Sequence, residues 1–283
     1  QFIVFERLNT GGVKLNDMEI RNCLFRGTLN DLVKELAKTS DFKKAVGQTD
    51  LSKRMQDRNL VLRFLAFYER TYHKCQYGLK RFLNEFLDAY KDARAEKIEE
   101  YRKVFNHSMK ACVTVFGDDG FRLKQETVRR SSMSGGAWAS RINTAIFQVV
   151  STSFVQYDLG RITRAADAIY EEYLDMINTD VQWVDRVRRA SFEASRLEYA
   201  FRIWNDRLKS VLLPFDSNDG QRVFSRRLKK EMFDTNPTCS LCDQQISLID
   251  DAILDHDHRY WVGGKTIPEN AQLAHRLCNL KKG

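Results

Sequence analysis

Residues 239–283 read CSLCDQQISLIDDAILDHDHRYWVGGKTIPENAQLAHRLCNLKKG, and this stretch decides how the last part of the chain folds. It contains two short pairs of metal-ligating residue types, Cys239-x2-Cys242 and His275-x2-Cys278. With two residues between the members of a pair, a tight turn can present both side chains to one tetrahedral zinc ion. The stretch therefore predicts a structural zinc site of three thiolates and one imidazole, which would close this segment into a small module.

The two ligand pairs enclose the run LDHDH at 254–258 and are followed directly by Asn279. Metal-assisted cleavage of a phosphodiester needs an oxygen ligand for a hard divalent cation, a base that activates water, and a neutral ligand that leaves coordination positions open. Asp255, His256 and Asn279 supply these three groups. Because a neutral imidazole at pH 7 can accept a proton from water, His256 is the predicted general base.

A different interpretation of the same residues is a structural zinc ribbon, which holds a small module together and has no chemistry of its own. The ligand pairs alone are compatible with it. A ribbon does not account for Asp-His ahead of Gly263-Gly264, nor for an asparagine directly after the last ligand. An unpaired Asp-His-Asp-His run is also costly to bury, which favours a metal-bound catalytic site.

This arrangement resembles the HNH nucleases, also called the ββα-metal or His-Me finger family, in which a hairpin carries Asp-His and a helix carries the closing asparagine. The resemblance implies zinc on Cys239, Cys242, His275 and Cys278, a catalytic Mg²⁺ or Mn²⁺ on Asp255 and Asn279, His256 as general base, and Asn270 as the hydrogen-bonding residue of the loop that orients the histidine.

Two features depart from the family pattern. His275 stands where many members have cysteine, and an imidazole binds zinc equally well. No proline follows the Asp-His pair, and Asp257 and His258 occupy that stretch instead. We expect His258 to contact the metal or the phosphate.

The overall charge favours a polyanionic partner. The 283 residues carry a formal net charge of +8, and the isoelectric point is about 9.1. A basic run precedes the zinc ligands, and its members are Arg222, Arg226, Arg227, Lys229 and Lys230. A basic run is most often a solvated helix face, but beside such a module we interpret it as a set of contacts to DNA phosphates.

The sequence also bears on location. No apolar run approaches the roughly 18 residues that a membrane span needs, and no signal peptide is visible. Cys23, Cys75 and Cys112 lie far apart in helical patterns. A disulfide framework is therefore not expected, and a reducing cytoplasm is the simpler location.

Upstream of the zinc ligands the pattern is helical. All three prolines, at 214, 237 and 268, lie in the last quarter of the chain. Apolar residues before them recur at helical spacing, as in the two stripes within 60–68 and 82–90. Asn16 and Glu19 form a capping pair, and Gly27 is the predicted end of that first helix. Further helices are predicted at 29–39, 56–74, 79–90, 94–116, 121–130, 138–154, 158–178, 190–210 and 223–233.

A second resemblance lies near the N-terminus, in FERLNTGG at 5–12 followed by EIRN at 19–22. A Gly-Gly turn entering a capped helix could place Arg7, Asn9 and Arg21 near an anion. The segment is similar to the Phe-x-x-x-Asn segment of the family that includes the GmrSD modification-dependent restriction enzymes. There, a ParB/sulfiredoxin-like nucleotide-handling domain and a helical region are joined to an HNH-type nuclease.

In that family an Asp-Gly-Gln-Gln-Arg motif precedes this segment, and the sequence lacks it. We therefore expect either a fragment of a longer protein or a sensor half on another polypeptide. Nucleotide binding is expected only together with that half, with Arg7 and Asn9 as contributors.

The resulting prediction is a mainly α protein. Residues 1–25 would end a GmrSD-like domain, 26–215 would form a multi-helix domain, and 216–283 would form a zinc-stabilised HNH finger. The predicted function is metal-dependent DNA cleavage in restriction of phage or other foreign DNA, modified DNA included. A homodimer or a separate sensor subunit would be the protein partner. The alternatives are an HNH nuclease with a junction-resolving, homing or RNA-directed role, and a non-catalytic zinc module that binds DNA.

Overall fold

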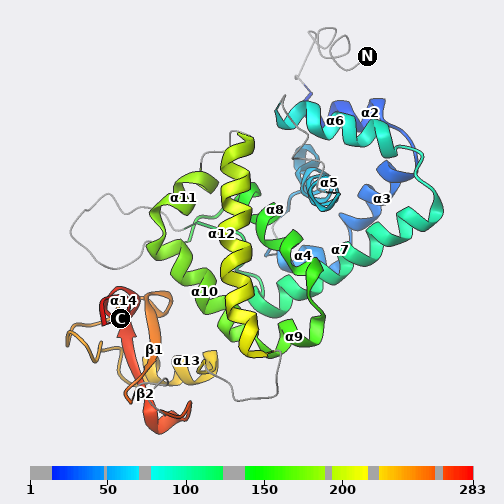
Figure 1. The fold of residues 1–283 in the computed structure, drawn as a ribbon. Coiled ribbons are helices and arrows are strands. Elements are labelled where there is room, and N and C mark those ends of the chain that lie inside the picture. Colours follow the sequence, from blue (N-terminus) through cyan, green and yellow to red (C-terminus); the bar gives the residue numbers. More distant parts are fainter. Residues whose placement is uncertain are drawn as a thin grey trace.

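Helices make up most of the chain before residue 216, and a small sheet with one helix ends it (Figure 1). The structure, a computed structural model, describes residues 15–47, 50–69, 78–123, 138–188, 193–215, 223–258 and 264–282. We call the described residues up to 215 the helical region and residues 223–282 the ββα module. The order of elements confirms the predicted fold class, a mainly helical protein followed by a small ββα unit beside a Cys/His cluster.

The helical region is an assembly of short and long helices that pack side by side (Figure 1). In chain order they are α2 (Asp17–Leu24), α3 (Thr28–Leu36), α4 (Ser40–Ala45), α5 (Gln56–Tyr68), α6 (Leu79–Tyr90), α7 (Ala95–Phe116), α8 (Thr144–Ser153), α9 (Leu159–Arg164), α10 (Ala166–Thr179), α11 (Val181–Arg188) and α12 (Ala194–Leu212). Short 3₁₀ turns are η1 (Lys53–Met55), η3 (Phe154–Gln156) and η4 (Leu213–Phe215). Within the described part of the chain, no helix has the length and apolar character to cross a membrane.

The start of α2 follows from its capping residues. The side chain of Asn16 accepts from the amides of Met18 and Glu19 at 2.8 and 2.9 Å, and the Asn16 amide donates to the Glu19 carboxylate at 2.7 Å. This reciprocal pair satisfies amides that have no partner inside the helix, and it confirms the predicted capping pair.

The prediction for Gly27 was wrong. The helix α2 already ends at Leu24, and Gly27 instead precedes α3 as its N-cap residue, with a φ of 146°. A Cβ at this position would lie 2.3 Å from the carbonyl oxygen of Lys91. Glycine is therefore required where the α3 entrance meets the end of α6.

The apolar stripes of the sequence form the core of the helical region. Phe64 is fully buried, and its ring meets that of Phe105 edge to face, with centroids 5.1 Å apart. Trp183 and Trp204 are also fully buried, and the indole N–H of Trp204 donates to Ser153 Oγ at 2.7 Å. The stripe residues Leu60, Val61, Leu65, Phe67, Phe82, Leu83, Phe86 and Leu87 are all buried.

Several helix boundaries differ from the prediction. The single helix predicted at 158–178 is divided into α9 and α10 at Ala165. The helix predicted from 138 begins only at Thr144, because Asn143 caps it by accepting from the amide of Ala145 at 2.9 Å. Both α4 and α11 were missed. Residues 121–123 are not helical, and the rest of the helix predicted at 121–130 lies outside the described residues.

The ββα module begins with the basic helix α13 (Arg226–Thr235). After the first ligand pair come η5 (Ile249–Asp251), β1 (Ala252–His256), η7 (Pro268–Asn270), β2 (Ala271–His275) and α14 (Arg276–Lys282). The two strands pair antiparallel, with Ala252 opposite His275 and His256 opposite Ala271. Among the described residues of the module, the buried hydrophobic cluster is small and consists of Cys239, Ile246, Ala252, Leu273 and Ala274.

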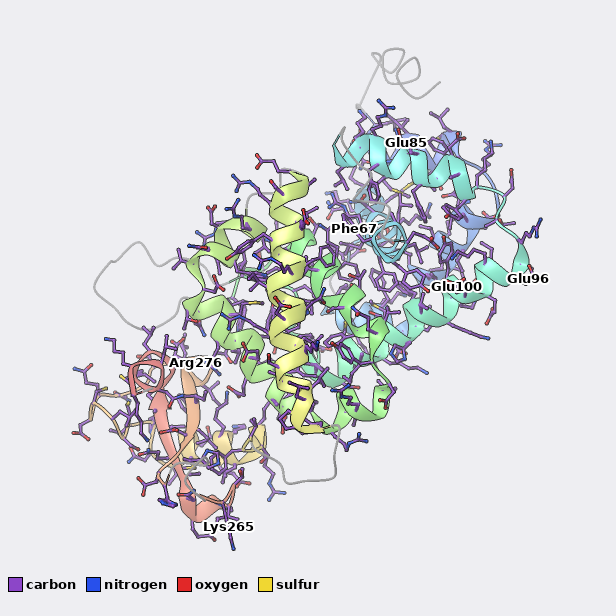
Figure 2. The ribbon with its side chains drawn as sticks, viewed as in Figure 1. Phe67, Glu85, Glu96, Glu100, Lys265 and Arg276 are labelled. Atoms are coloured by element: carbon purple, nitrogen blue, oxygen red, sulfur yellow. The ribbon has the colours of Figure 1, made fainter. Side chains whose placement is uncertain are left out.

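A buried ionic cluster joins the module to α10 of the helical region. Arg276, at the start of α14, is 3% exposed and ion-pairs with the carboxylates of Glu171 and, at 2.7 Å, Asp175 (Figure 2). Lys229 of α13 donates to the same Glu171 carboxylate at 2.6 Å. Glu171 thus receives one cation from each helix of the module. The shared carboxylate fixes the module against α10.

Candidate metal centre and adjoining cleft

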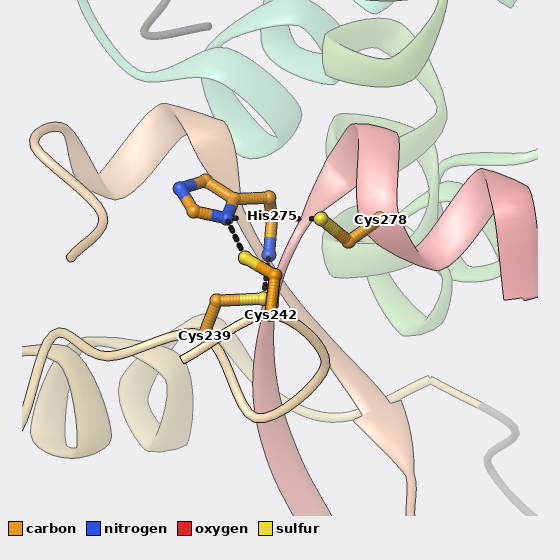
Figure 3. Close-up of side chains that lie close together, drawn as sticks. All are labelled: Cys239, Cys242, His275 and Cys278. Carbon is orange, nitrogen blue, oxygen red and sulfur yellow. Dashed lines mark hydrogen bonds between the residues drawn. The ribbon is translucent and has the colours of Figure 1, made fainter. Parts of the chain in front are cut away.

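The four predicted zinc ligands converge at one point of the module (Figure 3). Cys239 and Cys242 lie on the tight turn after α13, His275 ends β2, and Cys278 lies in the first turn of α14. The four ligand atoms all lie within 4.8 Å of one another. Residues separated by 33 positions in the chain are thereby brought together, with 3.4 Å between Cys242 Sγ and His275 Nδ1.

The local backbone supports this arrangement. Asp243, directly after the first ligand pair, has a φ of 57°, a left-handed conformation that aspartate tolerates better than most residues. Its amide donates to the carbonyl of Cys239 at 2.9 Å, and the amide of His275 donates to Cys239 Sγ at 3.3 Å. The turn and the end of β2 therefore present their ligands from fixed positions.

The donor set fits a zinc ion. Ligands about 2.3 Å from a tetrahedral ion lie about 3.8 Å apart, and Cys278 Sγ lies 3.9 Å from His275 Nδ1. Burial opposes ionisation of Cys239, but nearby donors, first the His275 amide, lower its pKa to about 7. Burial and the neighbouring Cys242 and Cys239 sulfurs raise the pKa of Cys278 to about 11. A cation at the centre of these crowded sulfurs would favour their ionisation, so the set suits a metal ion.

Asp255 lies on β1, and its carboxylate is already engaged by two side chains. Lys282, near the end of α14, donates from Nζ to Asp255 Oδ2 at 2.6 Å and to the carbonyl of His256 at 3.4 Å. Gln272, opposite Asp255 on β2, donates to the same carboxylate oxygen at 3.0 Å. The carboxylate that is predicted to bind a metal ion is therefore already paired with an ammonium group of the same chain, that of Lys282.

His256 follows Asp255 at the end of β1. Its Nε2 lies 3.0 Å from Thr266 Oγ1, and its ring stacks at a tilt on Phe224, with centroids 4.5 Å apart. These contacts fix the plane of the imidazole. Neither Thr266 nor Phe224 was identified from the sequence, because a threonine in a hairpin loop and a phenylalanine beside a basic run form no recognisable pattern.

Asn270 holds the two ends of the hairpin connection together. Its side chain accepts from the amide of His258 at 2.7 Å and donates to the carbonyls of His258 and Lys265 at 3.0 and 2.8 Å. Its backbone carbonyl accepts from the amide of Asp257 at 3.0 Å. The side chain of Asn270 thus ties down the residues that directly follow His256. The side chain of His258 is exposed.

Asp255, His256 and Asn279 line one cleft, which has a volume of about 470 Å³. Lys282 lies in the same wall, and the opposite wall comes from α10, the end of α12 and η4. The three residues predicted to bind metal and activate water are therefore brought together. They face the helical region across a cleft whose size is typical of a small-ligand site.

The predicted DNA-binding run does not form one solvent-facing patch. Lys229 is 4% exposed and paired with Glu171, so it faces the junction with α10 and not solvent. Arg226 pairs with Asp167 at 2.6 Å. Arg227 and Lys230 remain exposed, and each pairs with an acid four residues on in α13. Arg222, Arg7 and Asn9 lie outside the described residues.

Comparisons with models of protein families, with curated proteins and with solved structures found no match for this chain. The site is thus interpreted from its own residues. A cluster of three cysteines and one histidine, placed after a helical region and beside a two-stranded sheet and a helix, is compatible with an HNH-like zinc finger.

Proposed function

We propose that this chain is a metal-dependent endonuclease of the HNH type that hydrolyses phosphodiester bonds in DNA. The observation that carries the proposal is the convergence of Asp255, His256 and Asn279 on one cleft. The ligand pairs of the Cys/His cluster bracket Asp255 and His256 in the sequence, and Asn279 directly follows Cys278. A ribbon with a purely structural role does not require these three groups to share a cleft. Zinc on the four ligands would hold the module in shape, and the cleft residues would carry the chemistry.

In this proposal each group has a defined task. His256 takes a proton from water, with its ring plane held by Thr266 and Phe224. Asp255 and Asn279 would hold Mg²⁺ or Mn²⁺, which would supply Lewis-acid stabilisation of the phosphate. Asn270 keeps the backbone after His256 in place. Lys282 balances the charge of Asp255 in the absence of metal.

Only some members of the basic run on α13 are placed to contact DNA phosphates in the proposed enzyme. Arg227 and Lys230 on α13 are exposed and can exchange their weak intrahelical ion pairs for DNA phosphates. Lys229 serves the junction with α10 instead. We further propose that the substrate is foreign or modified DNA, as the resemblance of the N-terminal segment to GmrSD-like restriction enzymes suggests.

One observation favours the alternative of a non-catalytic module. The ion pair between Lys282 and Asp255 is geometrically complete without any added cation. If that pair is the whole purpose of Asp255, the module would be a zinc-stabilised binding unit for DNA or for a partner protein. The two proposals differ in whether the chain cleaves DNA in a reaction that requires His256, or binds DNA or a partner without cleaving anything.

The deciding experiment incubates the chain, at one zinc per molecule, with supercoiled plasmid in Mg²⁺ or Mn²⁺. His256→Ala and Asp255→Ala are tested beside it, and Asp257→Asn is the matched control because that exposed neighbour lies outside the proposed chemistry. Nicking by the wild type and by Asp257→Asn, with loss in the other two variants, supports the nuclease. Equal cleavage by all four proteins would identify a contaminant and contradict the proposal.

Substrate class is tested with the same proteins. Plain plasmid, phage DNA with modified bases and single-stranded DNA are compared at equal phosphate concentration. A restriction role predicts faster cleavage of the modified DNA. Binding of all three DNAs without cleavage in either metal, at full zinc occupancy, would instead favour the non-catalytic module.

A further inference from the structure

The helices α2, α5 and α6 lie at the end of the helical region far from the ββα module (Figure 1). Residues of these three helices line a second cleft. Its volume is about 570 Å³, and four of the residues that line it are cationic: Arg21, Arg54, Arg63 and Lys80. Among the described residues that line the cleft, Asp17 is the one acidic side chain. The cleft is separate from the proposed nuclease site, which uses none of these residues.

Two of the cations are held inside the protein by neutral oxygens. Arg21 is 2% exposed and donates to Asn84 Oδ1 at 2.8 Å and to the carbonyl of Lys80 at 3.2 Å. Arg63 donates from one terminal nitrogen to Gln148 Oε1 at 3.3 Å. The Nε atom of Arg63 is buried and has no hydrogen-bond partner among the described residues. A buried donor without an acceptor is costly, and it indicates that the native partner is not part of this chain's described residues.

The electrostatics of the pair support this interpretation. Burial, and then repulsion by Arg21, lowers the pKa of Arg63 to about 10. Burial also lowers the pKa of Arg21 to about 10, although Asp17 opposes the shift. Asp17 itself lies 3.2 Å from Lys80, and Glu19 lies 3.2 Å from Arg54. The acidic residues at the rim thus pair with the outer cations Lys80 and Arg54. The guanidinium groups of Arg21 and Arg63 remain close enough to repel each other within the cleft.

We propose that this cleft binds a small phosphate-bearing anion, with Arg63 and Arg21 donating to its phosphate oxygens. A guanidinium presents a planar set of N–H donors that matches phosphate geometry, and two of them together suit a group with more than one negative charge. The volume exceeds that of a single phosphate, and Leu15, Met18 and Leu79 supply an apolar wall. The ligand is therefore a polyphosphate or a phosphorylated small molecule. Arg63 is the residue on which binding depends most.

The test measures binding of sodium triphosphate by isothermal titration calorimetry and by the shift of the melting temperature, at fixed ionic strength. The wild type is expected to bind it, with melting raised by several degrees at saturation. Arg63→Gln should weaken binding at least about tenfold. Arg81→Gln is the control, since Arg81 lies on α6 with its side chain 57% exposed and pairs with Glu85. Binding should be unchanged in that variant.

Additional ligands identify the chemical class that is bound, and a second variant replaces Arg63→Gln if that variant does not fold. Succinate, added at the same total concentration of negative charge as triphosphate, tests whether the cleft recognises carboxylates as well as phosphates. ATP and GTP test whether it prefers a nucleotide to inorganic polyphosphate. If Arg63→Gln does not fold, Lys80→Gln at the more exposed rim serves in its place and should also weaken binding. Absence of triphosphate binding by the wild type, or equal affinity in the wild type and the cleft variant, would overturn the proposal. Either result leaves the plasmid-cleavage test of the ββα module unaffected.

Discussion

The helical region and the ββα module differ in what holds them together. The helical region has one continuous hydrophobic cluster that extends from Met18 to Leu212. The buried cluster of the module has five residues, and one of them, Cys239, is itself a predicted zinc ligand. Because each buried apolar side chain contributes only about 1.5–3 kcal/mol, the cluster formed by the described residues of the module does not by itself offset the conformational entropy of those residues.

This difference between the two regions explains why the module can expose polar residues that are suited to catalysis. In the helical region several buried polar side chains are hydroxyls that donate to helix carbonyls, as Ser151 does to Phe147 at 2.6 Å. In the module, fixed ligand positions hold two short strands, so polar residues such as Asp255 and His256 can lie partly exposed at the mouth of a cleft without weakening a core. Metal ligation at the Cys/His cluster would substitute for hydrophobic burial and leave the surface of the module available for function.

Of the changes considered, removal of zinc should produce the largest difference in stability between the helical region and the module. A chelator, or Cys239→Ser, is expected to unfold the module and leave the helical region folded, since structural zinc contributes about 10 kcal/mol or more. Hydrogen exchange would detect this as loss of protection in β1 and β2 with retained protection in α5 and α7. Cys23→Ser is the control, because Cys23 is exposed and lies outside the cluster. Retention of strand protection without zinc would contradict the assigned role of the cluster.

The next largest effect is expected at the junction. Glu171→Ala removes the carboxylate shared by Arg276 and Lys229 and leaves two buried cations without it. Loss of one partner from a buried ion pair costs about 3–5 kcal/mol. Urea denaturation should show this loss, whereas Glu193→Gln, which removes an exposed partner of Arg196, should leave stability nearly unchanged. A small effect of Glu171→Ala would mean that the module is not fixed to α10 by this cluster.

The same carboxylate gives a pH dependence. Burial opposes its ionisation, but Arg276 and Lys229 outweigh burial and lower the pKa of Glu171 below its ordinary value of 4.5. A lowered folded-state pKa contributes stability that is fully present above the unfolded-state pKa and is lost as pH falls through the folded-state pKa. The wild type should therefore lose stability below about pH 4.5 more steeply than Glu171→Gln, as followed by urea denaturation at several pH values. Parallel curves for the two proteins would contradict the assignment.

A smaller effect is expected within the cleft of the module. Lys282→Met removes the ammonium group from Asp255 and should tighten Mn²⁺ binding by about tenfold, because the cation no longer competes with Lys282. The affinity can be measured by electron paramagnetic resonance on zinc-loaded protein. Lys281→Met is the matched control, since Lys281 is exposed and adjacent. Equal Mn²⁺ affinity in both variants would show that Asp255 is not the metal ligand.

The parts of the fold that were predictable depend on neighbours in the sequence. The capping pair of Asn16 and Glu19, and the ligand pairs around residues 239–242 and 275–278, are set by spacings of two or three residues. The apolar stripes of α5 and α6 are likewise local. These features follow from backbone geometry alone and need no knowledge of the tertiary fold.

The features that were missed depend on partners far apart in the chain. Lys229 and Glu171 are separated by 58 residues, and Arg276 and Glu171 by 105. The sequence shows Lys229 only as one member of a basic run, and nothing nearby distinguishes it from its exposed neighbours. The break at Ala165 and the stacking of Phe224 on His256 are of the same kind, because tertiary packing decides them.

The smallest predicted effect concerns the cap of α2, a feature of the helical region that neighbouring residues in the sequence determine. Asn16→Ala removes the acceptor for the amides of Met18 and Glu19, and loss of such a cap costs about 1 kcal/mol. Asn16→Asp keeps an oxygen acceptor in the same place and should retain most of the stability. Because the cap is remote from the ββα module, zinc content and protection of β1 should be the same in both variants. An effect of Asn16→Ala on the module would show that the two regions unfold as one unit, and that the hydrophobic core, and not only the metal, then contributes to the stability of the site.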